Sequence, residues 1–587
     1  MRNGPPRTRR PVSRTRPASE KAPPALAPGD IRIIPLGGVE EIGKNMTAIE
    51  IGNDIVIVDI GFAFPTEEMP GVDYIIPDSS YVEKNKERVR GVIITHGHLD
   101  HTGGIPYIMP RLGNPPLYTR NLTSLFIKKR MDEFPHLPKL DIRIVENNSK
   151  ITLGEIAVRF FGVTHTIPDS MGVIVETPYG LIVNPGDFKL DLTGVDGVPT
   201  EQEEKTYEIF SKEKVLLLMS DSTNIENPGF SVPERETHKN LEVMIKNVRG
   251  RLFIGTFASQ LERMLKIVEI VEKYGRKLII EGRSMKTNME IAQLAGMWKL
   301  KPETVISMQD AGKYPDDKVV ILATGAQGEE FAALMRMANR THKFLRFKKG
   351  DTVLLSSSIV PGNEISVQKL KDNIARQGAK IISYRTSDVY IHSSGHGNRG
   401  EIEWLHKQIK PKFFIPIHGS HHKLRQHEEL ALELGMVPEN IVVPDNGMVI
   451  DITDGGTKIH ALKENVTNRI VMVDGMGQNN VEEVVIRDRQ QLSQEGMFVI
   501  IAIIDVRTGK VRKSPDIISR GFVYLKDSQE LLHQARLLAK RKIEESTAQM
   551  HPINFDYVKN VIREEVGRYL FQKTHHRPII LPVIIEV

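Results

Sequence analysis

A short stretch of the chain places three imidazoles and one carboxylate within six positions: His96, His98, Asp100 and His101. The stretch follows the apolar run 91–94 and precedes two glycines, so we expect it on a strand-to-helix loop. Such a group is typical of a metal site, although loop histidines also satisfy backbone groups. One turn cannot wrap a single ion with all four side chains. His96 and His98 can face one ion while Asp100 and His101 face a second, about 3.5 to 4 Å away.

Two metal ions need more ligands than this loop supplies, and other apolar runs of the chain end on suitable side chains. These are His165, Asp187 and His418, with Asp59 ending a further run. Each of them alone is as often a hydrogen-bonded turn residue as a ligand. Together with the loop at 96–101 they become candidates for a metal centre.

These residues carry a family resemblance. The run HGHLDH at 96–101, with Asp59 before it and His165 and Asp187 after it, resembles the metallo-β-lactamase superfamily. Three later segments resemble the additional motifs of the β-CASP nucleases: Ser220-Asp221-Ser222-Thr223, His392-Ser393-Ser394-Gly395-His396 and Pro416-Ile417-His418-Gly419. The order and spacing of all these motifs are similar to those of the bacterial ribonuclease J family, over residues 31–587.

The resemblance implies a ligand set and a mechanism. One metal would take His96, His98 and His165, the other would take Asp100, His101 and His418, and Asp187 would bridge them. A hydroxide held by the two ions would attack a phosphodiester in line, because even one zinc ion lowers the pKa of bound water to about 7. Asp59, which is not a primary ligand in the family, would orient the ligand loops.

The resemblance also assigns the segment 392–396 to the RNA backbone, through His392, Ser393, Ser394, Gly395 and His396. Backbone N–H groups, hydroxyls and imidazoles suit a phosphate, although a glycine-rich turn of this kind can also be structural. His396 would stabilise the transition state or protonate the leaving oxygen, and Asp221 would orient it. Catalytic roles therefore fall on Asp59, Asp100, Asp221 and His396.

The choice of metal follows from the ligand types. The chain has no cysteine, so disulfides and thiolate zinc sites are excluded. Imidazole and carboxylate favour two Zn²⁺ ions per subunit, and they also accept Mn²⁺ or Mg²⁺ for activity. Family members can hold a structural Ca²⁺ as well. Asp73 and Asp474 are candidates for that ion, and each is equally compatible with a turn-forming role.

The order of the elements predicts an α/β fold with an inserted domain. Strands dominate the first part of the chain, whereas a middle part alternates strands with helical stretches, which implies a parallel sheet. The predicted middle strands are 252–257, 277–281, 319–324, 353–357 and 380–384. Because His418 lies beyond them, this domain must interrupt the metal-binding one. The family counterpart is a metallo-β-lactamase αββα sandwich with an inserted β-CASP domain and a small α+β C-terminal domain.

We therefore expect five parts: a disordered basic tail at 1–30, a metallo-β-lactamase domain at 31–221 and 391–477, a β-CASP domain at 222–390 and a C-terminal domain at 478–587. In the last domain we expect strands at 498–506 and 578–587 and helical stretches at 528–546 and 555–572.

Charge and hydropathy add little about function. The net charge of +5 does not by itself argue for nucleic acid, and the arginine-rich tail could equally hold RNA or simply aid solubility. The basic runs 344–349 and 510–513 are more typical of solvated faces than of binding sites. The apolar run 497–504 is too short to span a membrane, and the N-terminus lacks a signal-peptide core. A cytoplasmic location is the default expectation.

Residues 38–44 fit the pattern G-x-x-x-x-G-K of a nucleotide-binding loop. However, Asn45 stands where a magnesium-binding hydroxyl is needed, and Glu40 and Glu41 would repel a phosphate. We therefore do not expect nucleotide binding. In the family this stretch is a loop beside the active site.

Three functions remain open. The first is a metal-dependent ribonuclease with 5′-to-3′ exonuclease and endonuclease activity on single-stranded RNA, preferably 5′-monophosphorylated, in RNA maturation and mRNA decay. It would act as a homodimer or homotetramer through the C-terminal domain, within an RNA-degradation assembly, away from membranes. The second is a hydrolase of small esters or lactones, which leaves Asp221, the segment 392–396 and the inserted domain unexplained. The third is a non-catalytic RNA-binding subunit, which fits poorly because no predicted ligand is missing.

Overall fold

The computed structural model describes residues 22–587 except 67, 195–196, 300, 302, 361, 476–482, 523–527, 549 and 551. Most of the expected basic tail, residues 1–21, lies outside the described residues. The described chain forms two compact units, one of residues up to 63 with 76–470 and the other of 64–75 with 471–587.

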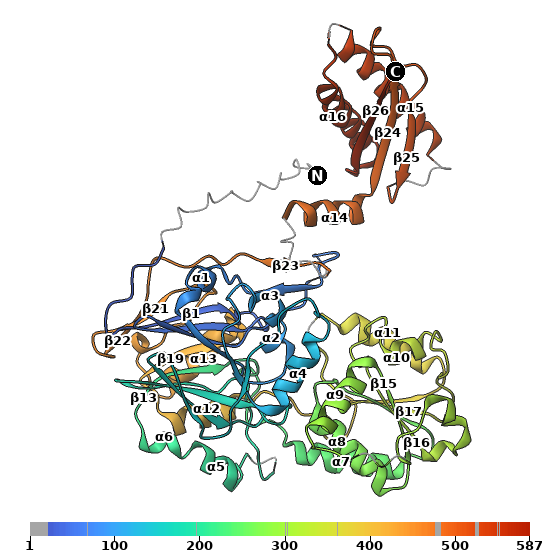
Figure 1. Cartoon of the computed structure of the whole chain (residues 1–587). Helices are drawn as coiled ribbons and strands as arrows, with labels where there is room; N and C mark the ends of the chain where they lie inside the picture. The colour runs from blue at the N-terminus through green and yellow to red at the C-terminus, as the bar shows by residue number, and fades with distance from the viewer. Residues whose placement is uncertain are drawn as a thin grey trace, which may run out of the picture. The chain divides into compact units, whose positions relative to one another are not determined.

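Two facing sheets form the centre of the first unit (Figure 1). The first has the order β22 (Lys458–Ala461), β21 (Ile450–Thr453), β1 (Ile31–Gly37), β3 (Met46–Ile51), β4 (Asp54–Val58), β6 (Val89–Ile93), β7 (Leu117–Thr119) and β8 (Ile142–Ile144). The second has the order β19 (Phe413–Ile417), β13 (Val215–Asp221), β12 (Gly180–Asn184), β11 (Met171–Thr177), β10 (Ile156–Gly162) and β9 (Lys150–Leu153). A short pair joins β2 (Val39–Glu40) to β20 (Gly419–Ser420).

The strands of both sheets are rich in β-branched residues and bury one shared core between them. Val56 and Ile93 of the first sheet belong to the same cluster as Val173 and Leu217 of the second. The helices of this domain are α1 (Ser80–Lys84), α2 (Leu99–Thr102), α3 (Ile105–Ile108), α4 (Asn121–Met131), α5 (Glu201–Tyr207), α6 (Ile209–Lys212), α12 (Arg399–Ile409) and α13 (His421–Glu433). Helices α12 and α13 pack on the outer face of the second sheet. The result is the expected αββα sandwich.

The inserted domain lies between β13 and β19, which pair with each other in parallel despite their separation in sequence. Its sheet is entirely parallel, in the order β15 (Lys277–Glu281), β16 (Val319–Ala323), β14 (Leu252–Gly255), β17 (Thr352–Leu355) and β18 (Lys380–Ser383). Helices cover both faces: α7 (Glu234–Asn247), α8 (Leu261–Lys273) and α9 (Arg283–Leu294) on one, α10 (Ala333–Ala338) and α11 (Glu364–Ala375) on the other. All five predicted strands are confirmed, as is the insertion.

The second unit contains a small α+β domain, as expected. Its sheet has the order β25 (Asp516–Arg520), β24 (Met497–Ile504) and β26 (Ile579–Glu586), and its helices are α14 (Glu483–Glu495), α15 (Gln529–Thr547) and α16 (Phe555–Thr574). Strands β5 (Tyr74–Ile76) and β23 (Val471–Val473) form a separate two-stranded sheet. Helix α14 was not predicted, because its apolar residues cluster at one end. Within the described residues, no helix combines the length and apolarity that a membrane crossing requires.

Candidate metal centre

The loop between β6 and α2 carries the first group of candidate ligands, and a buried carboxylate fixes its backbone. Oδ1 of Asp59 accepts hydrogen bonds from the backbone N–H and the hydroxyl of Thr95, at 2.8 and 3.1 Å. Asp59 follows β4, which pairs in parallel with β6, so both strands deliver their ends to the same edge of the sheet. The loop therefore has a defined shape before any ion binds.

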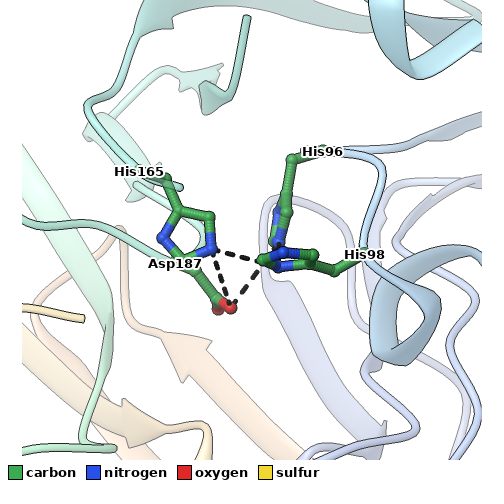
Figure 2. A group of neighbouring side chains, drawn as sticks. All are labelled: His96, His98, His165 and Asp187. Carbon is green, nitrogen blue, oxygen red and sulfur yellow. Dashed lines mark hydrogen bonds and ion pairs between the residues drawn. The ribbon is translucent and has the colours of Figure 1, made fainter. Parts of the chain in front are cut away.

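Four side chains converge at one position of the site (Figure 2). Nδ1 of His98 lies 2.9 Å from Nε2 of His96 and 3.1 Å from Nε2 of His165. Oδ2 of Asp187 lies 3.6 Å from Nε2 of His96 and 3.9 Å from Nε2 of His165. These atoms form a small cage of three nitrogens and one oxygen.

A second group shares Asp187 with the first. Nε2 of His101 lies 3.2 Å from Oδ2 of Asp187 and 3.5 Å from Oδ2 of Asp100. Nε2 of His418 lies 3.3 Å from Oδ2 of Asp100 and 3.7 Å from Oδ1 of Asp187. The structure therefore brings together all seven predicted ligands, in the two groups that the resemblance implied.

The hydrogen bonds behind these imidazoles show that the cages fit cations. Nδ1 of His165 lies 2.6 Å from the carbonyl oxygen of Gly395, which can only accept, so the proton is on Nδ1 and the Nε2 lone pair faces the cage. Nδ1 of His101 likewise faces Asp59 at 2.8 Å. Lone pairs that face one another in a buried cage are costly unless a cation lies between them. Nitrogen and oxygen donors in this number suit zinc.

The charges of the site are strongly coupled. Burial lowers the pKa of His98 to about 4 and the pKa of His165 well below its usual value, so both rings are neutral near pH 7. Burial opposes the ionisation of Asp187, but the charges of His101 and His418 outweigh it and hold the pKa of Asp187 well below its usual range. Asp187 is therefore a carboxylate available to both cages.

His396 lies beside the cages but has its own carboxylate partner. Its Nδ1 is 2.6 Å from Oδ2 of Asp221, and its Nε2 is 3.8 Å from Oδ2 of Asp187. Burial lowers the pKa of His396, but the carboxylates of Asp221 and Asp187 outweigh this effect and raise it. Asp221 also accepts a hydrogen bond from Thr223, whose Oγ1 lies 2.7 Å from Nδ1 of His418. His396 can thus carry a proton next to the metal positions.

Of the remaining residues of the predicted substrate segment, Gly395 contacts the ligand His165 through its carbonyl, whereas residues 392–394 have other partners. The hydroxyl of Ser393 donates to the carbonyl of Val232 at 2.5 Å. The hydroxyl oxygen of Ser394 accepts from Nδ2 of Asn224 and from the backbone N–H of His396, so its own hydrogen remains available to a substrate. His392 lies outside both cages, with its Nδ1 2.9 Å from Arg263.

Several residues of the site were missed by sequence reasoning. Thr95 directly precedes the ligand loop and Thr223 belongs to the motif 220–223, but neither was assigned a role of its own from the sequence. Their proximity to His96 and Asp221 was a usable signal. Lys189, which lies two residues after Asp187, reaches the carbonyl of Ser394 at 3.2 Å. Arg263 carries no signal in the sequence, because its partners lie far from it along the chain.

The calcium candidates lie elsewhere and have protein partners. Oδ2 of Asp73 accepts from the backbone N–H of Gly475 at 2.7 Å, and Asp474 pairs with Arg489 at 2.5 Å. Among the described residues, these two aspartates do not form a cluster of candidate ligands with each other. The glycine-rich loop at 38–44 lies beside the metal centre, as the resemblance implied, since the adjoining Asn45 donates to the carbonyl of Asp100 at 3.1 Å.

A groove lined by residues of both domains of the first unit begins at Leu99, next to the ligands His98 and Asp100. Four basic side chains and one acidic side chain line it: Lys129, Arg130, Arg283, Arg336 and Glu133. Phe331 is 83% exposed there, which is unusual for a phenylalanine. The groove therefore offers positive charge and an aromatic face beside the metal centre.

Matches to known protein families cover most of the chain. They are the metallo-β-lactamase superfamily at 40–197, the ribonuclease J β-CASP domain at 249–395, the Zn-dependent metallo-hydrolase RNA specificity domain at 386–444 and the ribonuclease J C-terminal domain at 484–587.

Similar proteins match nearly the whole chain. Ribonuclease J2 of Bacillus subtilis is 35% identical over 95% of this chain and 99% of its own length. Ribonuclease J 1 of Streptococcus pyogenes is 35% identical over 96% and 98%. A solved structure of a protein of unknown function from Enterococcus faecalis has the same fold over 72% of this chain and 100% of its own, with a TM-score of 0.52 and 17% identity. With these relatives and both buried ligand cages, the chain belongs to the ribonuclease J family of metallo-hydrolases, within the metallo-β-lactamase superfamily.

Proposed function

We propose that this protein is a two-metal ribonuclease that cleaves single-stranded RNA both from the 5′ end and internally, in RNA maturation and mRNA decay. The observation that carries the proposal is the juxtaposition of two ligand cages that share Asp187 with the protonatable His396. Small-molecule hydrolysis needs the cages alone. It gives no role to the pair of His396 and Asp221.

The ligands divide between two divalent ions, with His96, His98 and His165 for one, Asp100, His101 and His418 for the other, and Asp187 for both. When bound, such ions supply a hydroxide near neutral pH and positive charge beside the phosphate. We favour Zn²⁺ from the donor set and retain Mn²⁺ or Mg²⁺ as activating ions. Asp59 orients His101 and Thr95, so its role is positioning.

His396 supplies the proton chemistry that the cages lack. Asp221 holds its Nδ1, which leaves Nε2 directed toward the side of Asp187. A protonated Nε2 there donates to a phosphoryl oxygen as negative charge develops, or to the leaving oxygen as it departs. Asp221 keeps the proton on the imidazole because it stabilises the charged ring.

The segment 393–395 is our candidate for the 5′-terminal phosphate. Its backbone N–H groups and the hydroxyl of Ser394 are donors of the type that encloses a small anion. A monophosphate fits such a small nest, whereas a triphosphate adds bulk and charge. We therefore propose a preference for 5′-monophosphorylated RNA.

The groove that begins at Leu99 is our candidate path for the rest of the RNA. Lys129 and Arg283 form no ion pair with any described residue, so their charges are available to phosphates. Phe331 can stack on a base, an interaction that tolerates any sequence. These features favour a single-stranded polymer over a small ester.

Assembly through the C-terminal domain is part of the proposal. One face of its sheet packs on α15 and α16, whereas Leu581, Val583 and Ile585 on the other face are more than 40% exposed. Exposed apolar surface of this kind is typical of a protein interface. We propose a homodimer or homotetramer through this face, which can join a larger RNA-degradation assembly. A structural Ca²⁺ at Asp73 or Asp474 would have to replace the partners that they already have.

The test uses the purified protein and 5′-labelled single-stranded RNA, with and without a chelator. We expect mononucleotides and internal fragments that disappear with the chelator and return with Zn²⁺ or Mn²⁺. RNA binding without any cleavage would favour a non-catalytic subunit. Cleavage of small esters or lactones but not of RNA would favour the small-molecule hydrolase.

A further inference from the structure

Arg263, in the first turn of α8, is one of the largest fully buried side chains of the described residues, and it is charged. A buried guanidinium is costly unless every donor has a partner. The hydrogen-bond partners of Arg263 therefore indicate which groups its guanidinium positions.

The guanidinium joins a carboxylate to the predicted substrate segment. Nε and Nη2 of Arg263 form a two-pronged ion pair with Glu234 of α7, at 2.6 and 2.8 Å. Nη2 also donates to the carbonyl of Ser393 at 3.0 Å, and Nη1 donates to Nδ1 of His392 at 2.9 Å. A further bond from Nη1 reaches the carbonyl of Ser356 at 3.2 Å, at the end of β17.

A second cation holds the same segment from the metal-binding domain. Nζ of Lys189 lies 3.4 Å from Oγ of Ser393 and 3.2 Å from the carbonyl of Ser394. It also lies 3.6 Å from the carboxylate of Glu234. Glu234 thus balances both cations, and the segment 392–394 is held between the inserted domain and the sandwich.

The contact with His392 fixes the state of its ring. An arginine has only donors, so Nδ1 of His392 must accept, and the proton of the neutral ring is on Nε2. Burial and the charge of Arg263 lower the pKa of His392 to about 3, which agrees with a neutral ring. His392 is therefore a donor through Nε2 and not a cation.

We propose that Arg263, held by Glu234, is a positioning residue for recognition of a terminal phosphate monoester. It sets the main chain at Ser393 and the donor tautomer of His392, so that the donors of 393–395 are ordered before RNA binds. The inference rests on the proposed function, in which this segment binds the 5′ phosphate. Through Arg263 the inserted domain would contribute to the selection of the RNA end, although Arg263 itself would not contact the RNA.

The test compares RNA of one sequence with a 5′ monophosphate or a 5′ hydroxyl, and it measures the ratio of the two kcat/KM values. Arg263→Gln alone would leave the buried carboxylate of Glu234 with only Lys189 at 3.6 Å and His238 at 3.4 Å, so the main variant is Arg263→Gln/Glu234→Gln. We expect this ratio to fall on the order of tenfold or more, mainly through the KM of the monophosphate substrate. A ratio is insensitive to the folded fraction, so a general loss of stability would not lower it.

Arg276 provides a matched control, because it is also a buried arginine of the inserted domain. It is 4% exposed and donates to the carbonyls of Ile245 and Gly250, away from the segment 392–394. Arg276→Gln should keep the wild-type ratio even if it lowers the melting temperature.

Should the double variant not fold, Arg263→Lys takes its place, because it keeps a charge for Glu234 but cannot reach all the acceptors. An unchanged ratio in the folded variant overturns the inference, as does an equal fall in Arg276→Gln. If the unmodified protein cleaves no RNA at all, the proposed function fails first and the inference falls with it. If it cleaves RNA without preference for the monophosphate, only the assignment of the segment and this inference are lost.

Discussion

Each imidazole of the metal centre depends on a hydrogen bond on its far side. The carbonyl of Gly395 sets the proton of His165, Asp59 sets that of His101, and Thr223 faces His418. These partners decide which nitrogen faces the ion, so they affect metal affinity without touching it. Asp187 differs from them, because its Oδ2 lies 3.6 Å from Nε2 of His96 in one cage and its Oδ1 lies 3.7 Å from Nε2 of His418 in the other.

Asp187→Ala should therefore remove metal from both positions at once. We expect the content of tightly bound zinc to fall together with RNA cleavage, and the loss to exceed that caused by a change in any single histidine. Elemental analysis after gel filtration measures the metal. Retention of two ions per chain in this variant would refute the bridging role.

His396→Ala should separate chemistry from binding. The side chain lies beside the cages and is held by Asp221, so its removal should lower kcat by a factor on the order of 10² to 10⁴. RNA affinity and zinc content should remain close to wild type. Single-turnover kinetics with saturating enzyme measures the chemical step, and a normal rate there would exclude the proton-transfer role.

The two serines of the substrate segment should differ in effect. Ser393 already donates its hydroxyl hydrogen to Val232, whereas Ser394 keeps its own for a ligand. Ser394→Ala should therefore reduce the preference for monophosphorylated over triphosphorylated RNA by roughly tenfold or more, about the worth of one hydrogen bond to a charged group. Ser393→Ala is the matched control. A larger effect of the control would place the terminal phosphate elsewhere.

At the scale of elements, local sequence patterns predicted many of the strands and the order of the domains. The five strands of the inserted domain were recognised from their apolar runs, and the chain order required the insertion. The ligands were recognised because they end strands. Arg263 and Lys189 could not be found this way, since their roles depend on contacts between segments up to 205 residues apart. Helix α14 was missed because its apolar residues cluster at one end of the helix.

Helix α5 supports the loop that carries His165 through a buried acid. Oε2 of Glu203 accepts from the hydroxyl of Thr164 at 2.8 Å and from the backbone N–H of Asp191 at 3.3 Å. Burial raises the pKa of Glu203 to about 7. The folded state therefore keeps this proton up to about pH 7, whereas the unfolded chain releases it near pH 4.5. The protein loses stability as the pH rises between these values.

Glu203→Gln removes this ionisation, and its single amide oxygen can still accept both hydrogen bonds. Above pH 7 the variant should be more stable than wild type by up to about 3 kcal/mol, which corresponds to a few degrees in Tm. The gain should shrink toward zero as the pH falls to 4.5. Calorimetry at pH 8 and pH 5.5, each in the same zinc buffer, measures both differences. A gain independent of pH would contradict the ionisation of Glu203.

At the scale of the whole molecule, the sheet of the C-terminal domain has one face without cover among the described residues. The alternation along β26 places Ile580, which is 6% exposed, against the helices, and Val583, which is 43% exposed, on the open face. Ile518 of β25 is 43% exposed and belongs to the same sheet. The parallel pairing of β24 and β26 leaves β26 at an edge, where Pro582 interrupts further hydrogen bonding. A partner would therefore pack on the face and not extend the sheet.

Val583→Glu should for this reason break the oligomer and leave the domain folded. A carboxylate in the centre of an apolar interface loses its hydration without gaining a partner, which disfavours association by several kcal/mol in order of magnitude. Light scattering at micromolar concentration should give a dimer or tetramer for the wild type and a monomer for the variant. Leu537→Glu is the control, because Leu537 is 48% exposed on α15, away from this face. A monomeric wild type, or an oligomer that survives Val583→Glu and dissociates with Leu537→Glu, would move the interface away from β26.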